Sequence, residues 1–99
     1  MFGWEGGMRF AQQDLENYWL GGRLPRRVPP DLRKRLSMKL ATLAAVTSLE
    51  QLRIPPSNNL EKLRGDWDGY LSIRVNQKYR IVFRWTEEGA DDVDIIDYH

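Results

Sequence analysis

The amino-acid sequence predicts an α+β domain in which two N-terminal helices pack on a small antiparallel β-sheet. Apolar residues first recur at helical spacing and then alternate with polar residues from Leu60 onward, and a proline-containing segment separates the two patterns. The chain has 99 residues, which is the size of one domain, because two smaller cores could not offset their chain entropy. We therefore predict a single domain over residues 1–99.

The N-terminal part is predicted to hold a flexible extension and a first helix. Residues 1–7, which include three glycines, form the expected extension. Residues 8–10 either form a short strand or lead directly into the helix. The helix has an apolar face with steps of three and four residues, formed by Leu15, Tyr18 and Trp19. Gly21-Gly22 end it, because glycine tolerates the left-handed conformation of helix ends.

A longer second helix is predicted after a loop that contains Pro25 and Pro29-Pro30. Asp31 is expected in its first turn, where a carboxylate interacts favourably with the helix dipole. The apolar stripe of this helix consists of Leu32, Leu36, Leu40, Leu43 and Ala44. Four basic residues fall mostly outside the stripe: Arg33, Lys34, Arg35 and Lys39. They form either a surface for RNA or a partner protein, or an ordinary solvated helix face.

The segment between the helices and the sheet is predicted to be a short helical turn followed by an irregular loop. Thr47 and Glu50 match a capping box, which predicts a brief turn through Leu52. Residues 54–59 are rich in turn formers, and their two prolines lack the N–H group that a strand requires.

Two neighbouring strands are predicted from the alternation over residues 70–85. A two-residue connection between them would mix apolar and polar side chains on each face, whereas a connection over residues 76–78 keeps the faces uniform. The resulting pairs are Val75–Tyr79, Ile73–Ile81, Leu71–Phe83 and Arg74–Arg80. Like charges directly opposite each other repel, so the Arg74–Arg80 pair favours an external anion unless a carboxylate lies nearby.

The C-terminal segment is acidic, while the rest of the chain is basic. Residues 87–90 are predicted to turn the chain and residues 93–98 to form the last strand. Residues 1–86 carry all 15 Lys and Arg against eight Asp and Glu, a balance of +7, and residues 87–99 carry six acids and no base, a balance of −6. Clustered cations favour a polyanion partner through counterion release, although an ordinary solvated surface has the same composition.

The composition excludes several classes of protein. Cysteine is absent, which removes disulfides, thiolate nucleophiles and cysteine-ligated zinc. No apolar run approaches the roughly 20 residues of a membrane helix, and signal-peptide features are missing, so we expect a cytoplasmic protein without membrane contact. The sequence also lacks a Gly-rich phosphate loop with Lys, a G-x-S-x-G motif and a two-histidine metal motif. Acid–base and electrostatic chemistry remains.

The C-terminal residues are the candidates for that chemistry. His99 is the only histidine, and imidazole titrates near neutral pH, which suits proton transfer to or from a ribose or phosphate oxygen. On its own, a terminal histidine is more commonly a frayed surface residue or the remnant of a tag. Structural alternatives also exist for Arg80, which could balance the acidic tail, for Tyr98, which could belong to the core, and for Asp97, which could cap the strand end.

Several motifs follow one another in a defined order: Pro29-Pro30-Asp31-Leu32, Ala44-Ala45-Val46-Thr47-Ser48-Leu49, Leu63-Arg64-Gly65-Asp66, Tyr70-Leu71-Ser72-Ile73-Arg74-Val75, Tyr79-Arg80-Ile81-Val82-Phe83 and the terminal Asp97-Tyr98-His99. In this order and spacing they resemble the HigB-type toxins of the RelE superfamily. The resemblance implies an endoribonuclease that cleaves messenger RNA on the translating 70S ribosome without a metal or other cofactor. It also implies neutralisation by a cognate helix-turn-helix, HigA-like antitoxin.

The resemblance further implies catalytic roles for His99, Tyr98, Asp97 and Arg80. The residues predicted to bind RNA or phosphate are Arg64, Arg74, Lys78 and Arg84. Arg80 and Arg64 are expected to hold the scissile phosphate, and His99 is expected to exchange a proton. Tyr98 is expected to stack on or orient a base, and Asp97 to orient a neighbour or assist as a base.

The sequence departs from the family pattern at two places. Residues 1–7 do not resemble the short strand that usually opens the family. Arg64 stands where lysine is common, and arginine keeps the positive charge but cannot donate a proton near neutral pH.

Two other functions are compatible with the charge pattern. A non-catalytic binding module would dock on RNA or protein through its basic face, with an affinity that falls steeply with salt and without cutting RNA. An antitoxin or DNA-binding repressor would need a helix-turn-helix, which is not evident, because the second helix is followed by loop and sheet.

Overall fold

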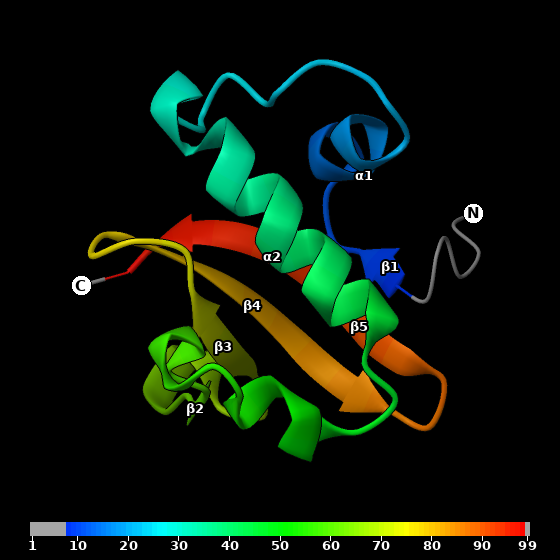
Figure 1. Ribbon diagram of the computed structural model, residues 1–99, viewed down its shortest axis with the longest axis vertical. Helices are drawn as coiled ribbons and strands as arrows, with labels where there is room; N and C mark the ends of the chain where they lie inside the picture. Colours follow the sequence, from blue (N-terminus) through cyan, green and yellow to red (C-terminus); the bar gives the residue numbers. More distant parts are fainter. Residues whose placement is uncertain (1–7, 99) are drawn as a thin grey trace.

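The computed structural model describes residues 8–98, so the predictions made for residues 1–7 and for His99 concern residues outside this described part. Its elements in chain order are β1 (Met8–Phe10), α1 (Gln13–Trp19), η1 (Pro30–Leu32), α2 (Arg33–Ala45), η2 (Leu49–Arg53), η3 (Pro56–Asn58), β2 (Glu61–Lys62), η4 (Gly65–Trp67), β3 (Leu71–Arg74), β4 (Tyr79–Thr86) and β5 (Gly89–Asp97), where η denotes a 3-10 helix. The five strands form one sheet in the order β1-β5-β4-β3-β2, and both α-helices lie on one side of it (Figure 1). The predicted α+β class is confirmed.

The sheet is mixed, and the prediction of a purely antiparallel sheet is wrong. β1 runs parallel to β5, with Met8 opposite Ala90 and Phe10 opposite Val93. The other three strand pairs are antiparallel. A three-residue strand carries too little alternation to reveal its partner, and this partner lies near the other end of the chain.

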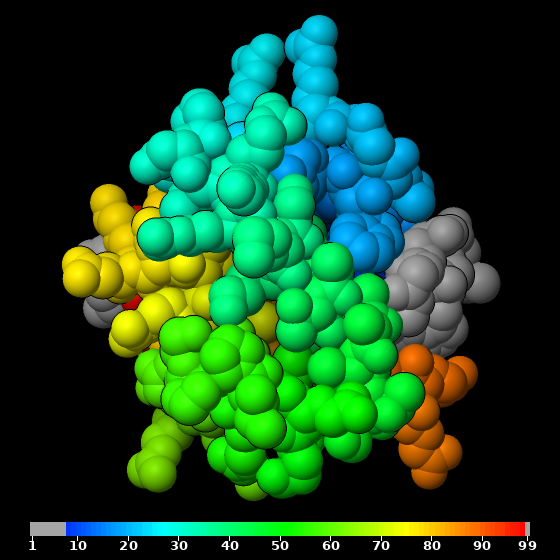
Figure 2. Space-filling view, in the orientation of Figure 1, coloured from blue at the N-terminus to red at the C-terminus, as the bar shows by residue number. Residues whose placement is uncertain are grey.

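The helices cover the sheet with the apolar faces that the sequence predicted. Leu15 of α1 is fully buried, as are Leu36 and Leu40 of α2. The core that they share with the sheet includes Met8, Leu43, Leu52, Ile73, Ile81, Phe83, Val93 and Ile95. From the helix side, α2 and the 3-10 segments that follow it conceal most of the sheet (Figure 2). No helix within residues 8–98 has both the length and the apolar character needed to cross a bilayer.

The predicted register of β3 and β4 is confirmed. Ile73 lies opposite Ile81, and Arg74 lies opposite Arg80. Asn76 stabilises the connection, because its Oδ1 accepts hydrogen bonds from the backbone N–H groups of Lys78, at 2.9 Å, and the first β4 residue, at 2.7 Å. The Asn76 side chain thereby provides the hydrogen-bond acceptor that a backbone carbonyl would provide in a tighter turn.

β5 begins four residues earlier than predicted, at Gly89 rather than Val93. The turn is therefore confined to Glu87 and Glu88, since Thr86 already pairs with Gly89. The register with β4 shifts between Val82 and Arg84, and Asp92 has a positive φ of 52° within this interval. Because of this irregularity, polar and apolar residues do not alternate regularly in the first half of β5, so the sequence pattern did not predict its start.

The predicted capping box is displaced by one residue. Ser48, not Thr47, is the N-cap of η2, and Gln51, not Glu50, is its reciprocal partner. The Gln51 carboxamide oxygen accepts hydrogen bonds from the backbone N–H groups of Thr47, at 2.7 Å, and Ser48, at 3.4 Å. The side-chain oxygen of glutamine accepts the same hydrogen bonds as that of glutamate. The sequence was therefore compatible with a Thr47–Glu50 box as well as with the Ser48–Gln51 box.

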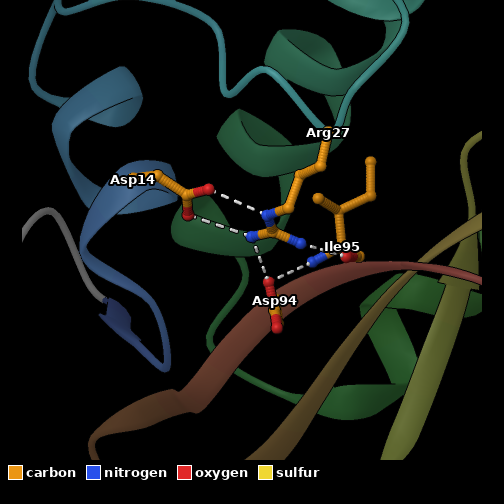
Figure 3. A network of polar contacts seen from close by, with 4 residues as sticks. All are labelled: Asp14, Arg27, Asp94 and Ile95. Atoms are coloured by element: carbon orange, nitrogen blue, oxygen red, sulfur yellow. Dashed lines mark hydrogen bonds and ion pairs between the residues drawn. The ribbon is translucent and has the colours of Figure 1, made fainter.

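Arg27 joins α1 to the part of β5 that β1 does not cover (Figure 3). Its Nε and Nη2 contact the two carboxylate oxygens of Asp14, at 2.8 and 3.0 Å. Nη2 also lies 2.7 Å from Oδ1 of Asp94, and Nη1 donates to the backbone carbonyl of Ile95 at 2.8 Å. The hydrogen bond with Asp14 is the largest cause that raises the pKa of Arg27. The guanidinium therefore bonds a backbone carbonyl on a part of the β5 edge that would otherwise be free to pair with another strand.

This network predicts an acid-sensitive contribution to stability. The hydrogen bond from Arg27 lowers the pKa of Asp14, so the contribution is present above the ordinary carboxyl pKa and is lost as the pH falls through the lowered value. We expect Asp14→Asn to reduce the free energy of unfolding by about 1 kcal/mol at neutral pH, because the pair is partly solvated. Urea titrations at pH values above and below the carboxyl titration should show the difference between wild type and variant shrinking in acid.

Asp31→Asn, which removes an exposed carboxylate in η1, is the matched control. Equal losses of stability in the two variants, or a wild-type–variant difference that persists at low pH, would contradict the assignment to the Asp14–Arg27 pair.

Candidate functional site

The face of the sheet opposite the helices carries most of the predicted site. Successive residues of a strand point to opposite faces, so the buried Ile73, Ile81 and Ile95, which pair with one another, all lie on the helix side. The alternate residues occupy the other face, hereafter the open face: Ser72 and Arg74 on β3, Arg80, Val82 and Arg84 on β4, and Glu61 on β2, directly opposite Ser72. The structure thus groups several basic side chains on one surface.

Arg80 lies flat along the open face instead of projecting into solvent, and it is only 6% exposed. Its Nε donates to Oγ of the fully buried Ser72 at 2.7 Å, and its Nη2 donates to the backbone carbonyl of Asn59 at 2.5 Å. Oε1 of Glu61 lies 3.9 Å from the same Nη2. The guanidinium is consequently fixed across β3, with its plane set by a partner on β3 and one in the segment before β2.

The Arg74–Arg80 pair has a carboxylate nearby, because Oε1 of Glu61 lies 3.9 Å from Nη2 of Arg80. Burial lowers the pKa of Arg80, and the positive charge of Arg74 acts in the same direction, whereas the Glu61 carboxylate opposes the shift. An arginine remains protonated at neutral pH even when its pKa falls. Arg80 is therefore a buried, oriented positive charge.

Tyr98 joins this group, and Asp97 contacts Lys78. Tyr98 is half-exposed, and its backbone N–H donates to the carbonyl of Lys78 at 2.8 Å, which holds the chain end beside the β3–β4 connection (Figure 1). Tyr98 is also among the groups that act on the pKa of Arg80. Asp97 pairs with Tyr79 on the helix side of the register, and its carboxylate lies 3.8 Å from Nζ of Lys78. Lys78 thus contacts the chain end rather than Arg80.

Arg84 belongs to a separate cluster further along β4. Its guanidinium lies 4.4 Å above the ring of Tyr70, and its Nε is 3.5 Å from Oδ2 of Asp92. The Tyr70 ring packs edge-on against Trp67 at 5.1 Å. The hydrogen bond with Tyr70 is the largest cause that raises the pKa of Arg84. Arg84 therefore has an aromatic ring and a carboxylate as partners, and its role in binding RNA stays a prediction.

Arg64 is exposed at the start of η4, immediately before Gly65, where φ is +66°. Three further residues belong to the site although their sequence pattern did not predict it: Ser72, Asn59 and Glu61. The sequence contained a partial signal for Ser72, because the alternation of polar and apolar residues along the strand places Ser72 on the same face as Arg74. Asn59 and Glu61 gave none, because β2 has only two residues and shows no alternation.

Among residues 8–98, no three imidazole or carboxylate side chains gather closely enough to hold a metal ion. Arg74, Glu61 and Tyr98 act on the charge of Arg80, and Glu61 is the carboxylate among them. The chemistry available from these described residues is the stabilisation of negative charge by Arg80, with a phenol beside it.

Solved toxin structures share the fold of this chain. The YoeB protein of the YoeB-YefM complex from Staphylococcus aureus superposes with a TM-score of 0.52 at 19% sequence identity, over 93% of this chain and 94% of that chain. A YoeB/ParE toxin from Agrobacterium tumefaciens superposes with a TM-score of 0.52 at 16% identity, over 93% and 98% of the two chains. These structures therefore share the fold of this chain.

The family follows from the sequence. The model of the RelE-like toxin of the type II toxin-antitoxin system HigB matches residues 8–99, so the chain belongs to the HigB-like toxins. Toxin HigB-1 of Vibrio cholerae is 36% identical over 80 residues, which cover 81% of this chain and 84% of the relative. A Haemophilus influenzae protein described only as uncharacterized is 33% identical over 84 residues, or 85% and 83% of the two chains. The resemblance drawn from the motifs is confirmed.

Proposed function

We propose that this toxin is an endoribonuclease that cuts messenger RNA on the translating ribosome. The observation that supports it best is the buried guanidinium of Arg80, held by Ser72 and Asn59 on the open face with Tyr98 beside it. A cation that is fixed and shielded from water stabilises developing negative charge more than a mobile one, because it needs no reorganisation during the reaction. Family membership makes an RNA phosphate the proposed target.

The proposed reaction uses the 2′-hydroxyl of the RNA as the nucleophile. Its oxygen attacks the adjacent phosphorus while a base removes its proton, and the bond from phosphorus to the 5′-oxygen of the next nucleotide breaks as that oxygen gains a proton. The products are a 2′,3′-cyclic phosphate and a 5′-hydroxyl end. Negative charge builds up on the phosphoryl oxygens, which Arg80 is proposed to stabilise, with Arg64 as a second cation.

The chain end is proposed to supply the remaining roles. His99 exchanges a proton with the reacting oxygens, because imidazole accepts and donates protons near neutral pH. Tyr98 stacks on or orients a base next to the scissile phosphate. Asp97 orients a neighbouring group or assists as a base, and its contact with Lys78 at 3.8 Å would have to open for direct participation.

We also propose that a cognate helix-turn-helix antitoxin of the HigA type neutralises the toxin in the cytoplasm. Two findings support a protein partner. The matching family is defined by a toxin-antitoxin system, and a structural relative was solved as the YoeB-YefM toxin-antitoxin complex.

The test is a cleavage assay with purified toxin, a defined messenger and programmed ribosomes. We expect new 5′-hydroxyl ends within the coding region when ribosomes are present and few or none on free RNA. Binding to ribosomes without any new ends would instead identify a non-catalytic binding module. Absence of both binding and cleavage would overturn the proposal.

Ser72 provides a prediction about how Arg80 is oriented. Replacing it by valine removes the hydroxyl that accepts from Nε of Arg80, while threonine keeps that hydroxyl at nearly the same volume. We expect the maximal cleavage rate of Ser72→Val to be about tenfold to a hundredfold lower than that of Ser72→Thr, since one hydrogen bond to a charged group contributes about 1.5 to 3 kcal/mol. The rate at saturating ribosome concentration measures this effect.

Any strain from the added methyl group is common to the two variants, so their ratio isolates the hydroxyl. Equal rates in the two variants would show that Ser72 does not orient Arg80 during the reaction.

A further inference from the structure

A hollow of about 430 Å³ lies between α2 and the connection from β3 to β4. Arg35 and Lys39 line it from α2, Ser57 lines it from η3, and residues 74–77 form the opposite wall. In Figure 2 these parts of the chain lie side by side at the left of the molecule, where α2 is cyan to green and the connection is yellow. The hollow is thus formed by segments that are distant in the sequence.

The charged residues that line this hollow are all positive. They are Arg35, Lys39 and Arg74, and the other lining residues are neutral. Within residues 8–98, none of the three forms an ion pair with a carboxylate. Nζ of Lys39 donates instead to Oδ1 of Asn58, a neutral acceptor. The three cations therefore keep their charge available to an anion.

The hollow adjoins the candidate active site through Arg74. This residue lines the hollow and lies directly opposite Arg80 in the β3–β4 register. Arg74 is also close enough to act on the electrostatics of Arg80. A row of positive charge consequently runs from the open face, past the end of β3, to the side of α2.

We propose that this hollow is a second phosphate-binding site, which holds the backbone of the single-stranded RNA next to the phosphate at Arg80. The inference rests on the proposed function, because it takes the scissile RNA as the occupant. An RNA strand carries regularly spaced charges, so it can engage both Arg80 and the hollow, whereas a free phosphate ion would occupy one of them. Arg74 is the residue shared by the two sites.

The test measures how tightly the toxin binds a short single-stranded oligonucleotide whose 2′-hydroxyls are methylated, so that it cannot be cleaved. The hollow variant is the double substitution Arg35→Gln with Lys39→Gln. The control is Arg23→Gln with Arg26→Gln, which removes two exposed positive charges that do not line the hollow. Urea midpoints of both variants establish that each remains folded.

We expect the hollow variant to bind at least about tenfold more weakly than the control at moderate salt. We also expect the negative slope of log affinity against log salt to become shallower by about 1.4 in the hollow variant, since each lost contact to single-stranded RNA removes about 0.7 from its magnitude. The control should keep a slope close to that of the wild type. Equal losses in both variants would reflect net charge alone and would overturn the proposal.

Two further outcomes separate this inference from the proposed function. If the hollow variant binds the oligonucleotide normally but binds ribosomes weakly, the hollow serves ribosomal RNA and the proposal is wrong. If the slopes differ as expected while the wild-type toxin never cuts RNA on ribosomes, the phosphate site stands and the proposed catalysis fails.

Discussion

Replacing Arg80 by glutamine is expected to lower the rate of messenger cleavage by about a hundredfold to a thousandfold, the typical cost of losing one oriented donor to a developing oxyanion. The guanidinium is buried and fixed by Ser72 and Asn59, so no solvent-exposed cation can readily take over its position. The measurement is the single-turnover rate of appearance of new 5′ ends on programmed ribosomes.

Arg80→Lys refines the same prediction. Lysine keeps the charge, but its single ammonium group cannot reproduce the planar arrangement that bonds Ser72 and Asn59 together. We expect a rate well below that of the wild type, because orientation as well as charge is lost. Arg53→Gln, which removes an exposed arginine from an ion pair with Glu50, is the control and should cleave normally. An Arg80→Gln toxin that retains most of the wild-type rate while folding normally would remove Arg80 from the mechanism.

Replacing His99 by alanine is expected to lower the cleavage rate by about a hundredfold to ten-thousandfold, the range typical for loss of a general acid or base. Expression of the wild-type toxin from a tightly controlled promoter should arrest growth, and expression of His99→Ala should not. The pH dependence of the rate gives a second readout, because the limb that reports imidazole titration should disappear in the variant.

Deletion of His99 serves as an independent form of the same test, since it removes the imidazole and leaves the rest of the described chain unchanged. Both variants should still bind ribosomes, because Arg80 and the cations around it remain. Growth arrest and cleavage that persist in both variants would show that His99 does not take part in the chemistry.

The parts of the fold that the sequence predicted are those where periodicity is strong and local. The stripe from Leu36 to Leu43 and the alternation around Ile73 and Ile81 each determine which face is buried, and the turn length then determines the register. The errors arose where pairing is non-local or interrupted. β1 pairs in parallel with β5 across almost the entire chain, and the irregularity at Asp92 breaks the alternation of β5.

The candidate site was predictable to a similar degree. The position of Arg80 opposite Arg74 followed from the register, and the motifs at the chain end indicated Tyr98 as a neighbour. The partners of Arg80 could not be predicted, because Asn59 contributes a backbone carbonyl, which any residue could supply. Glu61 reaches the site only through a strand of two residues. Sequence patterns report side-chain periodicity, and they contain little information about such contacts.

The strand order has a consequence for toxin synthesis. β5 lies between β1 and β4, so the strand that comes last in chain order among the described residues is an interior strand of the sheet. A nascent polypeptide interrupted before Gly89 therefore lacks the strand that joins its N-terminal part to the hairpin of β3 and β4, and it cannot complete its core. The strand order thus makes completion of the core depend on β5, which joins β1 to the β3–β4 hairpin.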